Sequence, residues 1–218
     1  RTEFRTTGKV TQGVLQGDLI VVGGMDPLVT SSELLQAAAS IKAQEGIRSI
    51  AGAIIYDLSM REDAPYGWGW CWDDDYGPLS ALMVNGKDGF EQKWTEAMKK
   101  AGIKHSASPR TAQRKADQDG KLIFTIRHDL DQLLEPMMKE SDNIFAECLF
   151  YQTAAATGKP MASRKDAAKL TSDLLTDIGL DPSGYTVADG SGLSLYNYVS
   201  PEMLVALLTY AWQTPNIR

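Results

Sequence analysis

An alternation of strand and helix signals in the N-terminal quarter of the chain is the feature that most constrains its fold. Residues 18–22 and residues 49–57 are apolar runs with the length and composition of buried strands. Between them, Thr30 and Glu33 have the spacing of a capping box, which predicts a helix that Gly46 ends in a left-handed conformation. The expected apolar stripe of this helix consists of Leu34, Leu35, Ala38 and Ile41. This order predicts one β-α-β crossover, which should be right-handed.

The signals in the rest of the chain are mainly helical. Apolar spacing and cap residues predict five further helices, at residues 90–101, 130–138, 144–155, 163–179 and 201–212. Pro136 lies within the second of these, so we expect that helix to be kinked or divided. Short strands are expected at residues 80–85 and 185–187.

The polar, turn-rich residues 104–120 are the best candidate for a domain boundary. A chain of 218 residues is long enough for one large domain or two smaller ones. We therefore expect a mixed fold of the α+β and α/β classes. Its α/β accessory domain should comprise residues 1–104, and its mainly helical domain should comprise residues 105–218.

Charge and composition exclude several classes of function. The net charge is −6, whereas a nucleic-acid partner would require a basic face, so none is expected. No apolar run approaches the roughly 20 residues of a membrane span, so we expect no transmembrane segment in this chain. The sequence opens at Arg1 without a signal peptide or an initiator Met, and both ends look like cuts in a longer protein.

Isolated cysteines and histidines give little indication of chemistry. Cys71 and Cys148 do not form a metal-binding pair, and we expect two unpaired, partly buried thiols, with a disulfide as the alternative. His105 and His128 lie in polar stretches and are expected to be solvated.

Ser141-Asp142-Asn143, directly before an apolar helical run, is the strongest candidate site. A hydroxyl both donates and accepts, so Ser141 can relay a proton, while the amide of Asn143 can orient a peptide carbonyl. Ser, Asp and Asn are also favoured helix caps, so the tripeptide has a purely structural interpretation as well. Ser-Asp-Asn is a motif of serine acyl-transfer enzymes, beside Ser-x-x-Lys and Lys-Thr-Gly, but neither of these occurs in the 218 residues.

A glycine-rich loop is the second candidate site. Its two glycines let the backbone approach a ligand closely, so the loop can line a cleft, although a tight turn is an equal interpretation. The candidate substrate-binding residues in it are Asp189, Gly190, Ser191, Gly192, Leu193 and Ser194.

Several segments, taken in order, resemble one family. They are Leu-Gln-Gly-Asp-Leu at residues 15–19, Gly-Gly-Met-Asp-Pro at 23–27, Gly-Trp-Cys-Trp-Asp-Asp at 69–74, the segment 140–147 and the loop 189–194. In this order they resemble the D-alanyl-D-alanine carboxypeptidase/endopeptidase family called penicillin-binding protein 4, the S13 serine peptidases. The resemblance covers nearly all of the chain, and several motifs in register are far more specific than any one of them.

The resemblance implies a reaction. In the family, the Ser of Ser-x-x-Lys attacks the D-Ala-D-Ala carbonyl of a peptidoglycan stem peptide, D-Ala leaves, and water hydrolyses the acyl-enzyme. β-Lactams acylate the same Ser. The family roles carry over only to Ser141, as a proton shuttle, and to Asn143, which would position the substrate.

The resemblance also implies an architecture and a location. Residues 105–218 would be the mainly helical portion of a DD-peptidase/β-lactamase-type transpeptidase domain, completed by segments outside this sequence. No metal or organic cofactor is implied. The parent enzyme would be periplasmic or otherwise extracytoplasmic in a bacterium, with peripheral membrane association left open.

The sequence departs from the family pattern in three ways. The first and third motifs are expected before Arg1 and after Arg218. A further inserted domain, which usually follows the segment matching residues 82–85, is expected to be missing, since only residues 86–89 precede the next helix. Leu195 stands where many relatives have a basic residue, which puts a substrate contact from that position in doubt.

The segment 68–76 holds three of the five tryptophans and a run of aspartates. One interpretation is a rim of aromatic faces and carboxylates, including Trp72, Asp73 and Asp74, that binds an ammonium-bearing stem peptide. The other is a packed loop whose Trp rings fill a small core. We favour the packed loop for the Trp residues and leave the carboxylates, Asp75 included, open.

Two other functions remain open from the sequence. One is a non-catalytic cell-wall binding or scaffolding protein with the same fold that has lost its nucleophile. The other is a β-lactamase-type hydrolase of the same superfamily, but the upstream α/β segment counts against it because a compact β-lactamase has no such insert. A Ser-x-x-Lys motif encoded before Arg1 would favour the peptidase over the binding protein.

Overall fold

The computed structural model describes residues 1–74, 76–105, 109–112, 120–159, 161–215 and 217. Its N-terminal part is built on a five-stranded sheet in the order β8-β6-β4-β1-β9. Three parallel strands form one side of this sheet, namely β4 (Leu19–Val22), β6 (Ile54–Asp57) and β8 (Arg110–Ala112). Two further strands extend it in antiparallel pairing beyond β4, namely β1 (Thr2–Thr6) and β9 (Lys121–Ile126).

A smaller four-stranded sheet lies at the end of the same part, in the order β2-β3-β5-β7. Its strands are β2 (Val10–Thr11), β3 (Val14–Leu15), β5 (Ser49–Ile50) and β7 (Lys104–His105). The expected single strand at residues 49–57 is therefore wrong, because its residues divide between β5 in this sheet and β6 in the larger one. The mixture of helices with two mixed sheets confirms the predicted fold class.

The predicted β-α-β crossover is confirmed, since β4 and β6 pair in parallel on either side of α1 (Ser31–Glu45). The capping box forms, with the backbone N–H of Glu33 donating to the Thr30 hydroxyl at 3.2 Å. Gly46 ends the helix with a φ of 69°, a left-handed conformation that glycine adopts without steric cost. Leu35 does not join the buried stripe: it is 37% exposed, and Ala37 is buried in its place.

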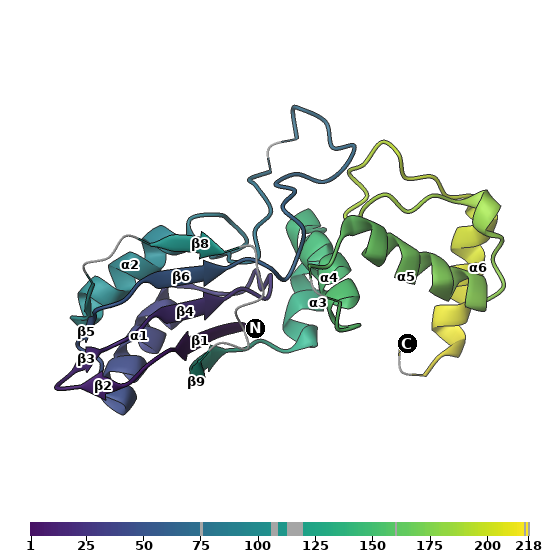
Figure 1. Ribbon diagram of the computed structural model, residues 1–218. Coiled ribbons are helices and arrows are strands. Elements are labelled where there is room, and N and C mark those ends of the chain that lie inside the picture. Colours follow the sequence, from purple (N-terminus) through teal and green to yellow (C-terminus); the bar gives the residue numbers. More distant parts are fainter. Residues whose placement is uncertain (75, 106–108, 113–119, 160, 216, 218) are drawn as a thin grey trace.

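One hydrophobic core fills the space between the large sheet and two helices, α1 and α2 (Phe90–Ala101), which contact each other (Figure 1). Aromatic rings occupy its centre, with the centroids of Phe4 and Trp94 4.6 Å apart. This core gives the N-terminal part a rigid frame for the loops that leave its strands.

The C-terminal part contains four helices in the described residues, α3 (Leu130–Lys139), α4 (Asn143–Ala155), α5 (Arg164–Asp177) and α6 (Pro201–Gln213), with a short 3-10 helix, η1 (Pro182–Gly184). The helix that we expected to be kinked or divided at Pro136 is one continuous assigned element, α3. Two predicted strands are wrong, because residues 80–85 and 185–187 contain only isolated bridges, Val84 to Lys87 and Thr186 to Tyr198.

A second hydrophobic core joins the two parts through α4. Ile144, Cys148 and Tyr151 on this helix pack with side chains from the N-terminal part, namely Met25, Leu79 and Met83. The amide of Gln152 also donates to the carbonyl oxygen of Met25 at 2.7 Å. Cys148 is buried and Cys71 is half-buried, and both are free thiols, as predicted.

The division of the chain at residues 104 and 105 remains a prediction. The strand that spans residues 104 and 105, β7, pairs with β5, while β8 and β9 pair with β6 and β1. These pairings favour an α/β part that continues to Ile126. Part of the expected boundary, residues 106–108 and 113–119, lies outside the described residues.

His128 is not solvated, contrary to expectation, but lies between two carboxylates with its side chain 11% exposed. Its Nδ1 is 3.0 Å from Oδ2 of Asp26 in the loop after β4, and its Nε2 is 2.9 Å from Oε1 of Glu33 in α1. Burial of the imidazole lowers its pKa, but hydrogen bonds and charges from Asp26 and Glu33 together outweigh this effect and raise the pKa above its usual value. The imidazole therefore ties the segment between β9 and α3 to the start of α1.

Replacing His128 by alanine should lower the free energy of unfolding by about 2 kcal/mol near neutral pH, because Asp26 is left buried without its imidazole partner. The raised pKa makes this contribution complete below the ordinary histidine pKa of 6.5 and lost as the pH rises through the folded-state pKa. Urea unfolding of both proteins from about pH 6 to about pH 9 should show the difference shrinking. A difference that grows with pH would contradict this account.

Candidate active site

Ser141 occupies the turn between α3 and α4 and is exposed. Its φ of 56° is left-handed, a conformation that costs a residue with a β-carbon about 1–3 kcal/mol and is most often retained at functional sites. The helix cap is the neighbouring Asp142, whose Oδ1 accepts from the backbone N–H groups of Ile144 and Phe145 at 2.9 and 3.1 Å. The capping interpretation of the tripeptide therefore applies to Asp142, and Ser141 is exposed directly before the helix start.

Asn143 is the first residue of α4 and is half-buried. Its Nδ2 donates to the phenolic oxygen of Tyr76 at 2.6 Å, and the Tyr76 ring lies 5.7 Å from that of Trp70. The amide is thus held at the helix start by a residue from the long loop between β6 and α2. Tyr76 could not be recognised from the sequence as the partner of Asn143, because a contact across 67 residues leaves no local pattern.

Asp189 organises the glycine-rich loop and is 5% exposed. Its two carboxylate oxygens accept five hydrogen bonds, from Trp70 Nε1, Ser191 Oγ, Gly192 N, Ser194 N and Asn197 Nδ2. A carboxylate surrounded by donors in this way fixes the loop as a tight turn. The two interpretations of the loop are compatible. Asp189 holds the turn by hydrogen bonds on its inner side, and the backbone on its outer side can still contact a ligand.

The long loop at residues 61–78 packs against this turn. Leu195 donates its backbone N–H to the carbonyl of Gly69 at 3.2 Å. The rings of Trp68 and Tyr196 stack with centroids 4.3 Å apart, and the guanidinium of Arg164 lies 4.5 Å from the centroid of Trp68. Two candidate segments more than a hundred residues apart in sequence therefore form one continuous surface.

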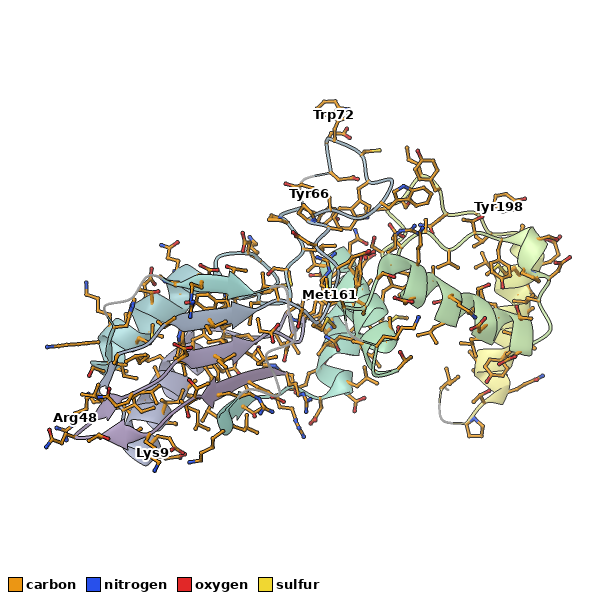
Figure 2. The ribbon with its side chains drawn as sticks, viewed as in Figure 1. Lys9, Arg48, Tyr66, Trp72, Met161 and Tyr198 are labelled. Atoms are coloured by element: carbon orange, nitrogen blue, oxygen red, sulfur yellow. The ribbon has the colours of Figure 1, made fainter. Side chains whose placement is uncertain are left out.

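The tip of the long loop differs from its base. Trp70 packs as expected, but Trp72 is 96% exposed, so the packed-loop interpretation is wrong for Trp72; Figure 2 shows it at the tip, with Tyr66 nearer the base. Asp74 accepts from the backbone N–H of Cys71 at 2.7 Å and closes the turn, whereas Asp73 is exposed. Asp75 lies outside the described residues.

An open cavity of about 310 Å³ lies beside the turn. Its walls come from α3, α4, α5 and the glycine-rich loop, and include Met137, Leu149, Phe150, Thr153, Asp189 and Gly190. Ser141 and Asn143 do not line it. Among the described residues, no group of three or more His, Cys, Asp or Glu side chains has the arrangement of a metal site.

Replacing Asp189 by asparagine should lower the free energy of unfolding by about 3 kcal/mol, because an amide nitrogen would then face N–H donors that now bond to a carboxylate. The matched control is Asp73→Asn at the exposed loop tip, which should change stability by less than about 0.5 kcal/mol. Denaturant unfolding measures both. If both substitutions changed the free energy of unfolding equally, Asp189 would not be the residue that holds the glycine-rich loop together.

Comparison with known proteins assigns the chain to a family. A sequence model of the D-Ala-D-Ala carboxypeptidase 3 (S13) family matches residues 1–89 and 78–218. The D-alanyl-D-alanine carboxypeptidase DacB of Haemophilus influenzae is 24% identical over an alignment of 292 residues, which covers 96% of this chain and 60% of that protein. Because this alignment is longer than the chain itself, the relative contains residues that this chain lacks.

Solved structures show the same fold. The crystal structure of penicillin binding protein 4 (dacB) from H. influenzae has a TM-score of 0.88 at 22% identity and covers 99% of this chain and 65% of that one. The structure of the same protein complexed with a novel β-lactam has a TM-score of 0.78 at 24% identity, covering 97% and 63%. This chain thus spans less than two thirds of the length of these relatives. It belongs to the D-Ala-D-Ala carboxypeptidase 3 (S13) family of peptidases.

Proposed function

We propose that the parent protein of this chain is a serine-type D-Ala-D-Ala carboxypeptidase or endopeptidase that cleaves peptidoglycan stem peptides through an acyl-enzyme. Family membership supports the reaction class. The single observation that carries the assignment of residues is the exposed, left-handed Ser141 directly before α4, with the amide of Asn143 held beside it. Plain helix capping would not require this conformation, because Asp142 already provides the cap.

The proposed chemistry divides between this chain and segments outside it. A serine of a Ser-x-x-Lys motif outside the 218 residues attacks the D-Ala-D-Ala carbonyl carbon, and the D-Ala amine leaves after taking up a proton. Ser141 passes that proton, since its hydroxyl can accept from a neighbouring base and donate to the leaving amine at once. Water then attacks the ester and regenerates the serine, and a β-lactam acylates the same serine by opening its ring.

Asn143 would orient the substrate. Only one hydrogen bond of its amide is used by Tyr76, which leaves a second N–H and the carbonyl oxygen for a peptide group of the stem. Fixing one N–H restricts the rotation of the amide and so reduces the entropy lost when substrate binds.

The two loops would form the substrate-binding wall. The glycine-rich loop, Asp189 to Ser194, presents its outer backbone, while Asp73 and Trp72 stand free at the tip of the long loop and can meet an ammonium group. Asp74 is already engaged in its own turn. Leu195 is 76% exposed and offers no charge where many relatives have a basic residue. We therefore assign recognition of the substrate's ammonium group to the acidic tip of the long loop.

We place the parent protein outside the cytoplasmic membrane of a bacterium, where its peptidoglycan substrate lies; this rests on the cell-wall enzymes that the chain resembles. None of the helices in the described part of the chain combines the length and apolar character needed to cross a membrane.

A non-catalytic cell-wall binding protein is the second candidate, and one observation favours it: neither Ser-x-x-Lys nor Lys-Thr-Gly occurs in the 218 residues. The sequence encoded before Arg1 separates the two. A Ser-x-x-Lys motif there supports the peptidase, and its absence supports the binding protein.

Ser141→Ala in the full-length protein should slow acylation by a fluorescent penicillin by about 10²- to 10⁴-fold, the range for a positioned proton-transfer group. Ser32→Ala is the control, because Ser32 is exposed on α1 in the α/β part, and should leave the rate unchanged. An unchanged rate for Ser141→Ala would return the residue to a purely structural role.

The 218-residue chain alone should not be labelled by fluorescent penicillin, whereas the full-length protein should be labelled at one serine. The reason is that the nucleophile is assigned to a segment outside these residues. Gel fluorescence followed by mass spectrometry of the labelled peptide provides the measurement. A labelled serine within the 218 residues would contradict the assignment.

A further inference from the structure

Glu147, in the middle of α4, is a buried carboxylate with an unusual set of partners. It is 1% exposed, and its Oε1 accepts from the backbone N–H groups of Gly190 and Ser191 at 2.8 and 2.9 Å. Neither donor belongs to the helix. A single carboxylate oxygen therefore ties the backbone of the glycine-rich loop to α4.

The loop also touches the helix directly at this point. A β-carbon placed on Gly190 would lie 2.5 Å from Cβ of Phe150 and 2.8 Å from the carbonyl oxygen of Ala146, distances that real β-carbons do not reach. Only glycine allows the backbone to come this close. The position of the loop is thus set by α4 through both contact and hydrogen bonding.

Helix geometry relates Glu147 to the candidate site. Asn143 and Glu147 are four residues apart, so they lie on the same face of α4, separated by about 6 Å along its axis. The residue that holds the loop and the residue that would orient the substrate therefore share one rigid element.

Ionisation of Glu147 costs free energy because its carboxylate is removed from water. Burial raises the pKa of Glu147, and the nearby charge of Asp189 raises it further, while the hydrogen bonds from Ser191 and Gly190 offset only part of the effect. A neutral glutamine would offer an acceptor oxygen to the same two N–H groups without the desolvated charge. When Glu147 is ionised, its charge-assisted hydrogen bonds hold the loop backbone more firmly than the neutral bonds of a glutamine would.

We propose that Glu147 is a positioning residue, whose carboxylate fixes Gly190 and Ser191 at a set distance from Asn143 so that the substrate is held between loop and helix. This rests on the proposed function. It adds that the shape of the binding wall depends on one buried carboxylate in α4.

Three variants of the full-length protein test this. Glu147→Gln keeps the shape and an acceptor but removes the charge, Glu147→Asp keeps the charge but withdraws it from the loop, and Glu135→Gln on the exposed face of α3 is the control. The measurements are the melting temperature, the rate of acylation by fluorescent penicillin, and hydrogen exchange at the amides of Gly190 and Ser191.

Glu147→Gln should melt at the same temperature as the unmodified protein or higher, yet acylate up to about 10²-fold more slowly, the cost of a small misplacement of a binding group. Its Gly190 and Ser191 amides should exchange faster. Glu147→Asp should also acylate more slowly, and the control should match the unmodified protein in all three measurements.

The proposal is overturned if Glu147→Gln acylates and exchanges like the unmodified protein, or if its acylation falls only together with its melting temperature. Should Glu147→Gln fail to fold, unchanged exchange and acylation in Glu147→Asp would overturn it instead. If the unmodified protein is not acylated at all, the proposed function fails, and hydrogen exchange still decides whether Glu147 holds the loop.

Discussion

Burial of the apolar face of α4 is the interaction on which the rest of this structure depends. Ile144, Cys148 and Tyr151 are removed from water between the N-terminal α/β part and the helices that follow. A buried aliphatic or aromatic side chain contributes about 1.5–3 kcal/mol, so these contacts hold the two parts together far more strongly than the surface ion pairs do. Because α4 is fixed at its centre, the orientation of its first turn is fixed as well.

Polar groups around this core fix the geometry of the candidate site. Asp189 and Glu147 are both buried carboxylates, and each is satisfied by backbone donors of the glycine-rich loop. Tyr76 and Trp70 extend the same network to Asn143 and to Asp189 from the long loop. Two loops distant in sequence are thereby held against the N-terminal half of α4, an arrangement that a hydrophobic core alone would leave loosely specified.

The helices could be predicted from sequence because their signals are local. The capping boxes at Thr30 and Ser163 and the Ser200-Pro201 start all lie where the structure places helix ends. The strands expected at residues 80–85 and 185–187 did not form, because a strand requires a partner that local propensity does not reveal. His128 was misjudged for the same reason, since both of its carboxylate partners lie about a hundred residues earlier.

The candidate site was only partly predictable. Motif resemblance singled out Ser141, Asn143 and the glycine-rich loop, but the contacts that hold them in place, through Tyr76 and Glu147, follow from tertiary packing.

In the proposed enzyme, the start of α4 presents Ser141 and Asn143 to an acylated serine. A crystal structure of the full-length protein after reaction with penicillin tests it most directly. We expect the Ser141 hydroxyl and the Asn143 amide within about 3 Å of the acylated serine or its adduct, directly or through one water. An adduct far from the start of α4, with both side chains facing bulk solvent, would contradict the account.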